Sequence, residues 1–233
     1  MDILGLIPAR GGSKSIPHKN IVPLLGRPLL AYTCEAAPAS ARLSRVIIST
    51  DDPHIAQLAR EHGLEVPFMR PQELAQDDTL ALPVVQHAVR WLEVSEGYKP
   101  DAVMILQPTS PLRRAEHIDG AVEVMDRTGA DTVVSVVEAP HRYSPGSLMS
   151  FNERRRLVSY QSGPMVLRRQ EKPILYARNG PAVLLVKHST LMAHGTLYGA
   201  NTQPYLMDEI DSFDVDTSND LIIIEALMKH RRQ

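Results

Sequence analysis

The sequence of 233 residues predicts an α/β fold in which helices cover both faces of a mostly parallel, Rossmann-like sheet. Short apolar runs rich in β-branched residues alternate with segments of helical apolar spacing, as expected for βαβ units. The length suffices for one such domain with a small insertion. Hydrophobic residues make up 43% and charged residues 22% of the chain, which is ordinary for a globular protein.

Five strands are expected in the first part of the chain. Each is an apolar run bounded by polar or turn-forming residues. These runs cover residues 3–7, 45–49, 64–68, 102–106 and 131–137. The run at 102–106 is the most hydrophobic, so we place it centrally in the sheet.

Helices are expected between these strands. They cover residues 28–37, 53–62, 79–94 and 115–127, and a last helix follows Thr217. Asp52 followed by Pro53 is a good N-cap and first-turn pair, and Gly63 ends that helix. Thr217 to Asp220 fits a capping box, and the basic residues at the far end of the last helix suit its dipole.

The alternation stops between residues 138 and 173. This stretch is polar, contains several prolines and has only short apolar pieces. We therefore expect an inserted lobe at 138–173, with the α/β domain formed by 1–137 and 174–233. The arginine run 154–156 is expected to form a solvated turn. The apolar pattern returns at residues 174–176 and 182–186, and a further strand is expected at 211–216.

Composition argues against several classes of protein. The net charge of −2 gives no sign of non-specific nucleic-acid binding. We find no apolar run that could span a bilayer and no signal peptide before the first strand. The only cysteine, Cys34, falls in an expected helix, where we read it as buried, and it fits a reducing compartment. We expect a cytoplasmic protein with no nucleic-acid or membrane partner, and no zinc site.

The stretch from Ile7 to Asn20, IPARGGSKSIPHKN, directly follows the first strand. Its glycines let consecutive backbone N–H groups turn toward one point, which suits an anion. Arg10, Lys14 and Lys19 add charge that suits a polyphosphate. A solvated basic turn is the alternative, but open α/β sheets bind ligands where such loops lie. The stretch is neither a Walker A loop nor a dinucleotide fingerprint.

This stretch resembles the signature IPARGGSKxIPxKN of the CMP-sialic acid synthetases, the acylneuraminate cytidylyltransferase family, whose loop wraps the triphosphate of CTP. The resemblance implies a sheet of the nucleotidyltransferase type. It implies these nucleotide-binding residues: Ala9, Arg10, Gly11, Gly12, Ser13, Lys14, Lys19 and Asn20. Arg10 and Lys19 would lie close to the reacting phosphate and, with Asp216, are the expected catalytic residues.

An acidic motif near the C-terminus is the expected metal site. Mg²⁺ prefers one or two carboxylates together with water and phosphate oxygens. On a strand, Asp214 and Asp216 would share one face while Phe213 and Val215 faced the core. A solvated edge is the alternative. The segment resembles the family's D-[IV]-D-T-x-x-D-[LF], whose paired aspartates hold Mg²⁺, and Asp211 is expected to add charge behind the pair.

Two further motifs match the family. Residues 106–113, LQPTSPLR, follow the central strand and match at every position. The resemblance implies that Gln107 contacts the acceptor sugar and that Arg113 supports the site. The related Kdo cytidylyltransferases carry an aspartate-bearing loop here, so the match argues against that branch.

The pocket for the nucleoside is expected between two other segments. Ser49 to Asp51 would shape it. Arg70, with Pro71 and Asp77, resembles the family's R-P-x-x-L-A-x-D segment. The resemblance implies that Arg70, and Thr79 just beyond the segment, handle base and ribose. A surface arginine is a serious rival reading of Arg70.

The acceptor side is expected to use arginine, which binds carboxylates through two parallel hydrogen bonds. The family has R-R-Q followed by N-G at the spacing seen here, so Arg169, Gln170 and Arg178 are the expected sugar-binding residues. After Gly180 the chain departs from the family, because the residues from Pro181 onward lack the aromatic-containing strand usual in sialic acid enzymes. The identity of the sugar is therefore left open.

Taken together, the resemblance implies transfer of CMP from CTP to the anomeric hydroxyl of a nine-carbon α-keto sugar acid, with Mg²⁺ as cofactor and release of pyrophosphate. It also implies a homodimer in which the stretch 138–173 reaches the partner. The acceptor could be N-acetylneuraminic, legionaminic or pseudaminic acid. A catalytically silent nucleotide-binding scaffold on the same fold is the alternative from another class.

Overall fold

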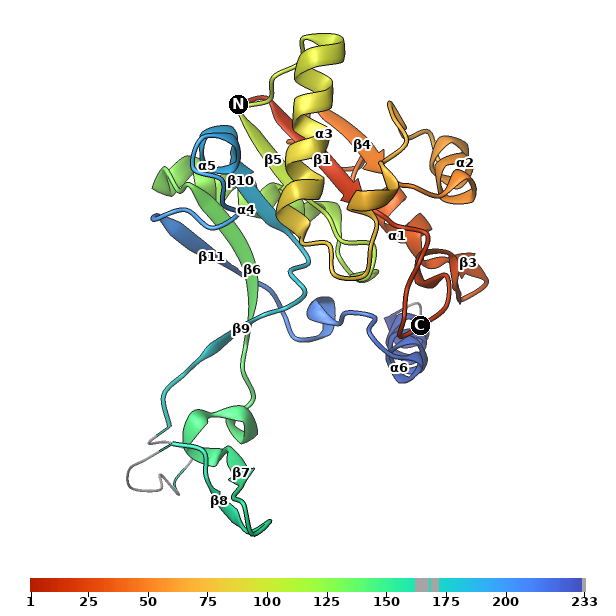
Figure 1. Cartoon of the computed structure of the whole chain (residues 1–233). Coiled ribbons are helices and arrows are strands. Elements are labelled where there is room, and N and C mark those ends of the chain that lie inside the picture. The colour runs from red at the N-terminus through yellow and green to blue at the C-terminus, as the bar shows by residue number, and fades with distance from the viewer. Residues whose placement is uncertain (162–167, 169–171, 232–233) are drawn as a thin grey trace.

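A single seven-stranded sheet organises the computed structural model, which describes residues 1–161, 168 and 172–231. The strand order is β11-β6-β10-β5-β1-β4, and β9 pairs with the outer part of β6 (Figure 1). The strands are β1 (Ile3–Pro8), β4 (Arg45–Ser49), β5 (Ala102–Ile105), β6 (Thr132–Glu138), β9 (Tyr176–Arg178), β10 (Leu184–Lys187) and β11 (Thr202–Leu206).

The sheet is mixed but mostly as predicted. β1 runs parallel to both β4 and β5, and β6 runs parallel to β11. β10 is antiparallel to both of its neighbours, β5 and β6, and joins the two parallel halves. The C-terminal ends of β1 and β5 therefore lie side by side, which is where a ligand crevice is expected in an open α/β sheet.

Helices cover both faces of the sheet, as the sequence predicts. One apolar cluster packs α1 (Leu29–Ala36), α2 (Pro53–Glu61) and α4 (Ala115–Thr128) on one face and includes the buried Cys34. A second cluster packs α3 (Ala81–Glu96) and α5 (His188–Met192) on the other face. A third cluster seats α6 (Ser218–Arg231) against Val215, Leu112 and the start of α1. Asp52 caps α2 as predicted, because its carboxylate accepts from the N–H groups of His54 and Ile55.

Two predicted strands are wrong. Residues 64–68 make a single isolated bridge, from Glu65 to Ile47 of β4, and Pro67 within this run has no N–H to donate to a ladder. Residues 211–216 begin as part of a short 3₁₀ turn, Ile210–Ser212, and continue without a strand partner. The backbone groups of Val215 bond to two loops, described below, which is why no ladder forms. β11 was not predicted, and it is an edge strand that contains Pro204.

The chain leaves the sheet beyond β6 and returns through β9. The two strands pair at Val136↔Arg178 and Glu138↔Tyr176, and the N–H of Ala139 donates to the carbonyl of Leu175 at 2.8 Å. The stretch between 139 and 175, here called the arm, projects away from the sheet and carries the hairpin β7 (Met149–Phe151) and β8 (Leu157–Ser159) (Figure 1). The arginine run 154–156 is exposed at the hairpin turn, which confirms the solvated reading.

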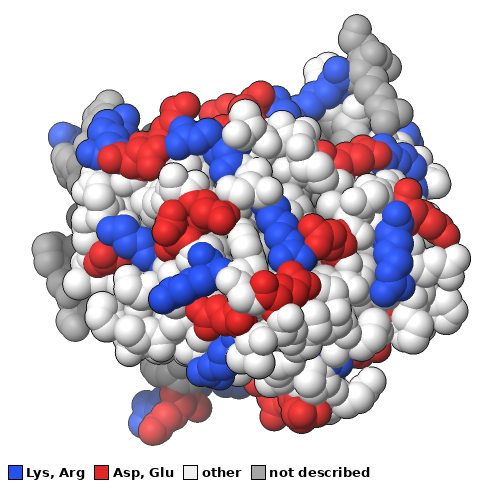
Figure 2. All heavy atoms as spheres, turned by 90° about the horizontal axis from the view of Figure 1, so that it is seen from above, with Lys and Arg blue, Asp and Glu red and all other residues white. Residues whose placement is uncertain are grey.

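Positive and negative side chains are interspersed over the face seen in Figure 2, and neither sign forms a continuous patch there. Within the part of the chain that the structure describes, no helix combines the length and the apolar character needed to cross a membrane.

The position of β10 between the two halves of the sheet gives a first prediction. Leu185 is fully buried in the cluster under α4. Leu185→Ala should lower the free energy of unfolding by about 2–5 kcal/mol, the cost of lost burial plus a cavity. Chemical denaturation measures this, with Leu206→Ala on β11 as the control, because Leu206 is 59% exposed. Equal, small effects in both variants would contradict the packing described here.

Candidate active site

Three segments that are far apart in sequence meet at the C-terminal ends of β1 and β5. The main chain of Val215 joins them, because its N–H donates to the carbonyl of Thr109 at 2.8 Å and its carbonyl accepts from Lys19 Nζ at 2.7 Å. Lys19 Nζ also lies 3.3 Å from Asp216 Oδ1. The cationic loop and the acidic motif, 196 positions apart, are therefore in direct contact.

A cleft of about 240 Å³ opens beside this junction. Many of the predicted nucleotide and sugar residues line it: Arg10, Gly12, Ser13, Lys19, Asn20, Arg70, Thr79 and Gln107. The rest of the lining includes Ala81, Val84 and Val85 of α3, which the sequence indicated only as helix and core. The cleft thus has one polar, cationic wall and one apolar wall, a combination that suits a nucleotide.

The loop after β1 is fastened to the start of α2. The N–H of Gly11 donates to Asp51 Oδ1 at 3.1 Å, and Asn20 Nδ2 donates to the carbonyl of Arg10 at 2.8 Å. The buried Ala9 donates its N–H to the carbonyl of Ser49 at 3.0 Å. A Cβ on Gly11 would come within 2.5 Å of the carboxylate of the α2 cap, so only glycine fits there.

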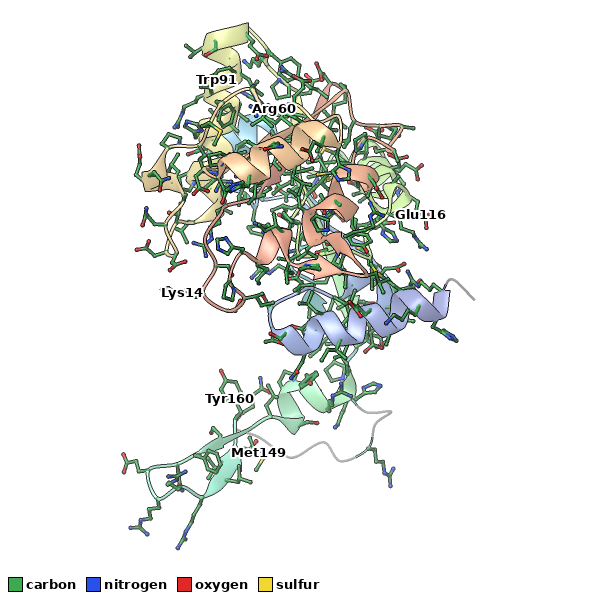
Figure 3. All side chains as sticks on the ribbon, turned by 90° about the vertical axis from the view of Figure 1, so that its right-hand side faces the viewer. Lys14, Arg60, Trp91, Glu116, Met149 and Tyr160 are labelled. Atoms are coloured by element: carbon green, nitrogen blue, oxygen red, sulfur yellow. The ribbon has the colours of Figure 1, made fainter. Side chains whose placement is uncertain are left out.

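Two cations of the loop share one carboxylate from the opposite side. Arg10 Nη1 lies 2.8 Å from Asp77 Oδ1, and Lys14 Nζ lies 3.2 Å from Asp77 Oδ2. These contacts, that of Lys14 foremost, lower the pKa of the Asp77 carboxyl. Figure 3 shows Lys14 on a loop at the edge of the body.

Arg70 forms part of the cleft wall, and the surface reading of this residue is wrong. Only 6% of Arg70 is exposed. Its Nε donates to Ser49 Oγ at 3.0 Å and its Nη2 donates to the carbonyl of the same serine. Burial lowers the pKa of Arg70 to about 10. Ser49 and Arg70 thus fix each other in the wall of the cleft, and Thr79 lies on the same lining.

Arg113 clamps the loop after β5. It is 3% exposed, and its Nη1 donates to the carbonyls of Gln107 and Ala182, each at 2.8 Å. Its Nη2 donates to Thr33 Oγ1 at 2.5 Å. Burial lowers the pKa of this guanidinium to about 9. The clamp holds the backbone from which the Gln107 side chain enters the cleft.

Asp214 and Asp216 have different surroundings. Asp214 is half-buried, Ser110 Oγ donates to its Oδ1 at 3.1 Å, and burial, with the charge of Asp216, raises its pKa. The side chain of Asp216 is 78% exposed and pairs with Lys19. Gly180 lies beside the Asp214 carboxylate, and its φ of +114° is a backbone conformation that favours glycine.

No group of three or more His, Cys, Asp or Glu side chains that could hold a metal ion is found among residues 1–161, 168 and 172–231. The paired Asp214 and Asp216 still fit Mg²⁺, because this ion completes its shell with water and phosphate oxygens.

Asp211 belongs to another cluster. Its carboxylate is 2% exposed and lies 3.0 Å from Arg114 Nη2, 2.5 Å from Arg231 Nη2 and 3.3 Å from His117 Nε2. It joins α4 to the end of α6, where basic residues suit the helix dipole. The expectation that Asp211 adds charge behind the acidic pair is therefore wrong, because three basic side chains already engage it.

The predicted acceptor residues are only partly described. Arg169 and Gln170 lie outside the described residues. Arg178 on β9 is not part of the cleft lining, and its Nη1 lies 3.0 Å from the hydroxyl of Tyr198, with its guanidinium 5.3 Å from the ring centroid. No sequence pattern indicated Tyr198 as a neighbour of Arg178.

Comparison with known proteins gives consistent matches over the whole chain. The profile of a family described as cytidylyltransferase matches residues 4–231. CMP-N,N'-diacetyllegionaminic acid synthase of Legionella pneumophila is 35% identical over 231 residues, 98% of this chain and 97% of that protein. N-acylneuraminate cytidylyltransferase of Escherichia coli O18:K1:H7 is 30% identical over 99% of this chain, which spans 53% of that relative. Pseudaminic acid cytidylyltransferase of Campylobacter jejuni is 28% identical over 98% of this chain and 97% of its own length.

Solved structures show the same fold. CMP:2-keto-3-deoxy-manno-octonic acid synthetase, solved in complex with CTP, matches with a TM-score of 0.71 and 18% identity, over 99% of this chain and 100% of that one. 4-Diphosphocytidyl-2C-methyl-D-erythritol synthase from Anaerococcus prevotii matches with a TM-score of 0.63 and 11% identity, over 98% of each chain.

The raised pKa of Asp214 predicts a gain in stability when its charge is removed. Because the folded state raises this pKa, the ionised carboxylate costs free energy above the ordinary carboxyl pKa, and the cost disappears below it. In metal-free protein at neutral pH, Asp214→Asn should raise Tm by roughly 2–4 °C. This is the shift that a gain of about 1 kcal/mol in the free energy of unfolding produces in a chain of this size. The difference should shrink as pH falls toward 4.

Differential scanning calorimetry at several pH values makes this measurement. Asp78→Asn is the control, because Asp78 is an exposed aspartate that forms no ion pair among the described residues. A lower Tm for Asp214→Asn at neutral pH would contradict the prediction.

Proposed function

Because the chain belongs to the cytidylyltransferase family, we propose that it transfers CMP from CTP to the anomeric hydroxyl of a nonulosonic acid and releases pyrophosphate. The contact of the cationic loop with the acidic motif through Val215 carries the proposal, because one triphosphate with its metal can reach both. The chain is accordingly a nucleotidyltransferase.

The reaction is an in-line displacement at the α-phosphorus of CTP. The anomeric oxygen forms the new P–O bond and loses its proton, while the bond to the leaving pyrophosphate breaks. Arg10 and Lys19 would balance negative charge that builds on the phosphate oxygens, as fixed donors do in phosphoryl transfer. Arg70 and Thr79 would hold the nucleoside, and Gln107 would orient the acceptor at the other end of the cleft.

Asp214 and Asp216 would hold Mg²⁺. When bound, the ion would supply positive charge to the phosphates and lower the pKa of the attacking hydroxyl. Asp214 is fixed by Ser110, while Asp216 would have to exchange its contact with Lys19 for the ion. That exchange would release the Lys19 ammonium toward the phosphate.

Relatives that act on legionaminic acid make this class of sugar the first acceptor to test. Two such synthases are 35% and 31% identical to the chain over nearly its full length. N-acetylneuraminic and pseudaminic acids are the other candidates. Arg169, Gln170 and Arg178 stay predictions for the acceptor side. The CMP-sugar would serve carbohydrate biosynthesis, such as that of lipopolysaccharide or capsule.

We also propose that the chain forms a homodimer through the arm. The arm exposes a row of large apolar side chains: Tyr143 (56%), Phe151 (69%), Leu157 (61%), Tyr160 (67%) and Ile174 (62%). Figure 3 shows Met149 and Tyr160 on the arm, apart from the body. An apolar group of this kind on a projecting element suits burial against another protein surface. A cytoplasmic location is proposed because CTP is an intracellular nucleotide.

Activity is tested by measuring pyrophosphate release from CTP and from UTP with a panel of nonulosonic acids. CTP with a legionaminic acid should give the highest kcat/KM. Asp216→Ala should lower kcat at least 100-fold while CTP still binds, and Asp78→Ala, a nearby exposed carboxylate, should be unaffected. No turnover with any acceptor, although CTP binds, would favour the scaffold alternative.

The dimer is tested by sedimentation equilibrium. The wild-type chain should sediment as a dimer, and the double variant Phe151→Ser, Leu157→Ser should sediment as a monomer with an unchanged Tm for the body. Arg154→Ser, at the exposed hairpin turn, is the control. A wild-type monomer at concentrations of tens of micromolar would overturn the proposal.

A further inference from the structure

We propose that Asp77 competes with polyphosphates for Arg10 and Lys14 and so weakens the binding of the product pyrophosphate by this loop. Pyrophosphate would then leave the cleft readily after transfer. The role in product release rests on the proposed function. The competition itself concerns only how this loop binds anions.

The first observation is the position of the carboxylate. One oxygen of Asp77 contacts the guanidinium of Arg10 at 2.8 Å and the other contacts the ammonium of Lys14 at 3.2 Å. Arg10 and Thr79, two residues beyond Asp77, line the same cleft. The bridge thus joins the loop after β1 to the segment before α3, across the rim of the cleft.

The second observation is the charge balance of the loop. Its three cations all pair with carboxylates: Lys19 with Asp216, and Arg10 and Lys14 with Asp77. Among the described residues, Arg10 and Lys14 form no other ion pair. Two carboxylates therefore offset two of the loop's three positive charges before a phosphate arrives, although its residue types suit a polyphosphate.

The third observation is exposure. The side chains of Asp77 and Lys14 are 39% and 81% exposed, and that of Arg10 is 30% exposed. Ion pairs this open to water are weak and exchange readily. A polyphosphate can displace the carboxylate, because it brings several charged oxygens where Asp77 brings one charge. An anion with less charge gains less from the same displacement.

Competition of this kind acts on both ends of the reaction. On entry, the carboxylate subtracts affinity from every anion that must use Arg10 and Lys14. After transfer, pyrophosphate is the group left on these cations, and the return of Asp77 would favour its departure. Asp77 is thus assigned a role in product release, separate from binding of the base.

The test is calorimetric titration of metal-free protein with inorganic pyrophosphate, CMP and CTP at one fixed salt concentration. Asp77→Asn should bind pyrophosphate at least fivefold more tightly than wild type, while CMP affinity should change less than twofold. Asp77→Glu, which restores the charge, should return pyrophosphate affinity toward the wild-type value. Asp78→Asn is the matched control, since Asp78 is exposed and forms no ion pair among the described residues.

Steady-state inhibition by pyrophosphate gives a second readout. The inhibition constant should fall in Asp77→Asn by the same factor as the dissociation constant. Unchanged or weaker pyrophosphate binding by a folded Asp77→Asn variant, judged by its Tm, would overturn the inference. Failure of the wild-type chain to bind CTP would instead overturn the proposed function. The pyrophosphate affinities of wild type and Asp77→Asn would still test the role of Asp77, because that comparison does not involve CTP.

Discussion

The hydrogen bonds of one peptide segment, at Val215, hold the candidate site together. The side chain of Val215 is fully buried against α6, while its N–H and carbonyl bond to Thr109 and Lys19. Burial of such a side chain contributes roughly 1.5–3 kcal/mol, and each hydrogen bond about 0.5–1.5 kcal/mol. Apolar packing against α6 therefore contributes about as much to the position of this segment, and of the aspartates that flank Val215, as its two hydrogen bonds do.

The site also contains charged side chains whose burial in the folded chain is unfavourable. Arg70 and Arg113 are almost fully buried and have lowered pKa values, and Asp214 has a raised one. Neither arginine forms an ion pair among the described residues, so both depend on carbonyl and hydroxyl acceptors. Such arrangements cost stability and cluster at functional sites. The three apolar clusters of the sheet and α6 offset this cost.

Much of the architecture could be predicted because the apolar spacing of each segment matches the face that the segment buries in the fold. Strands β1, β4, β5 and β6 and the helices between them follow apolar periodicity closely. The antiparallel direction of β10 could not be predicted, because a short apolar run carries no information on its partners. The run at 64–68 failed because Pro67 removes a donor, and that at 211–216 because loop contacts replace a ladder.

The site was predictable for a different reason. Its loops carry motifs in which several residue types recur at fixed spacing, so Arg10, Lys19 and Gln107 could be placed on one cleft in advance. Pairings that depend on the folded chain could not. Asp77 was recognised only as a member of a motif, and Tyr198, beside Arg178, had no signal at all. The apolar wall from α3 looks in sequence like ordinary helix interior.

The arm leaves and re-enters the sheet at one place, where β6 and β9 pair with each other. Among the described residues, the other strands of the main sheet pair with one another and not with the arm beyond this stem. Residues can therefore be gained or lost in the arm over evolutionary time without disturbing the catalytic body. A lineage could alter the surface that the arm presents to other proteins while the chemistry of nucleotide activation stays the same.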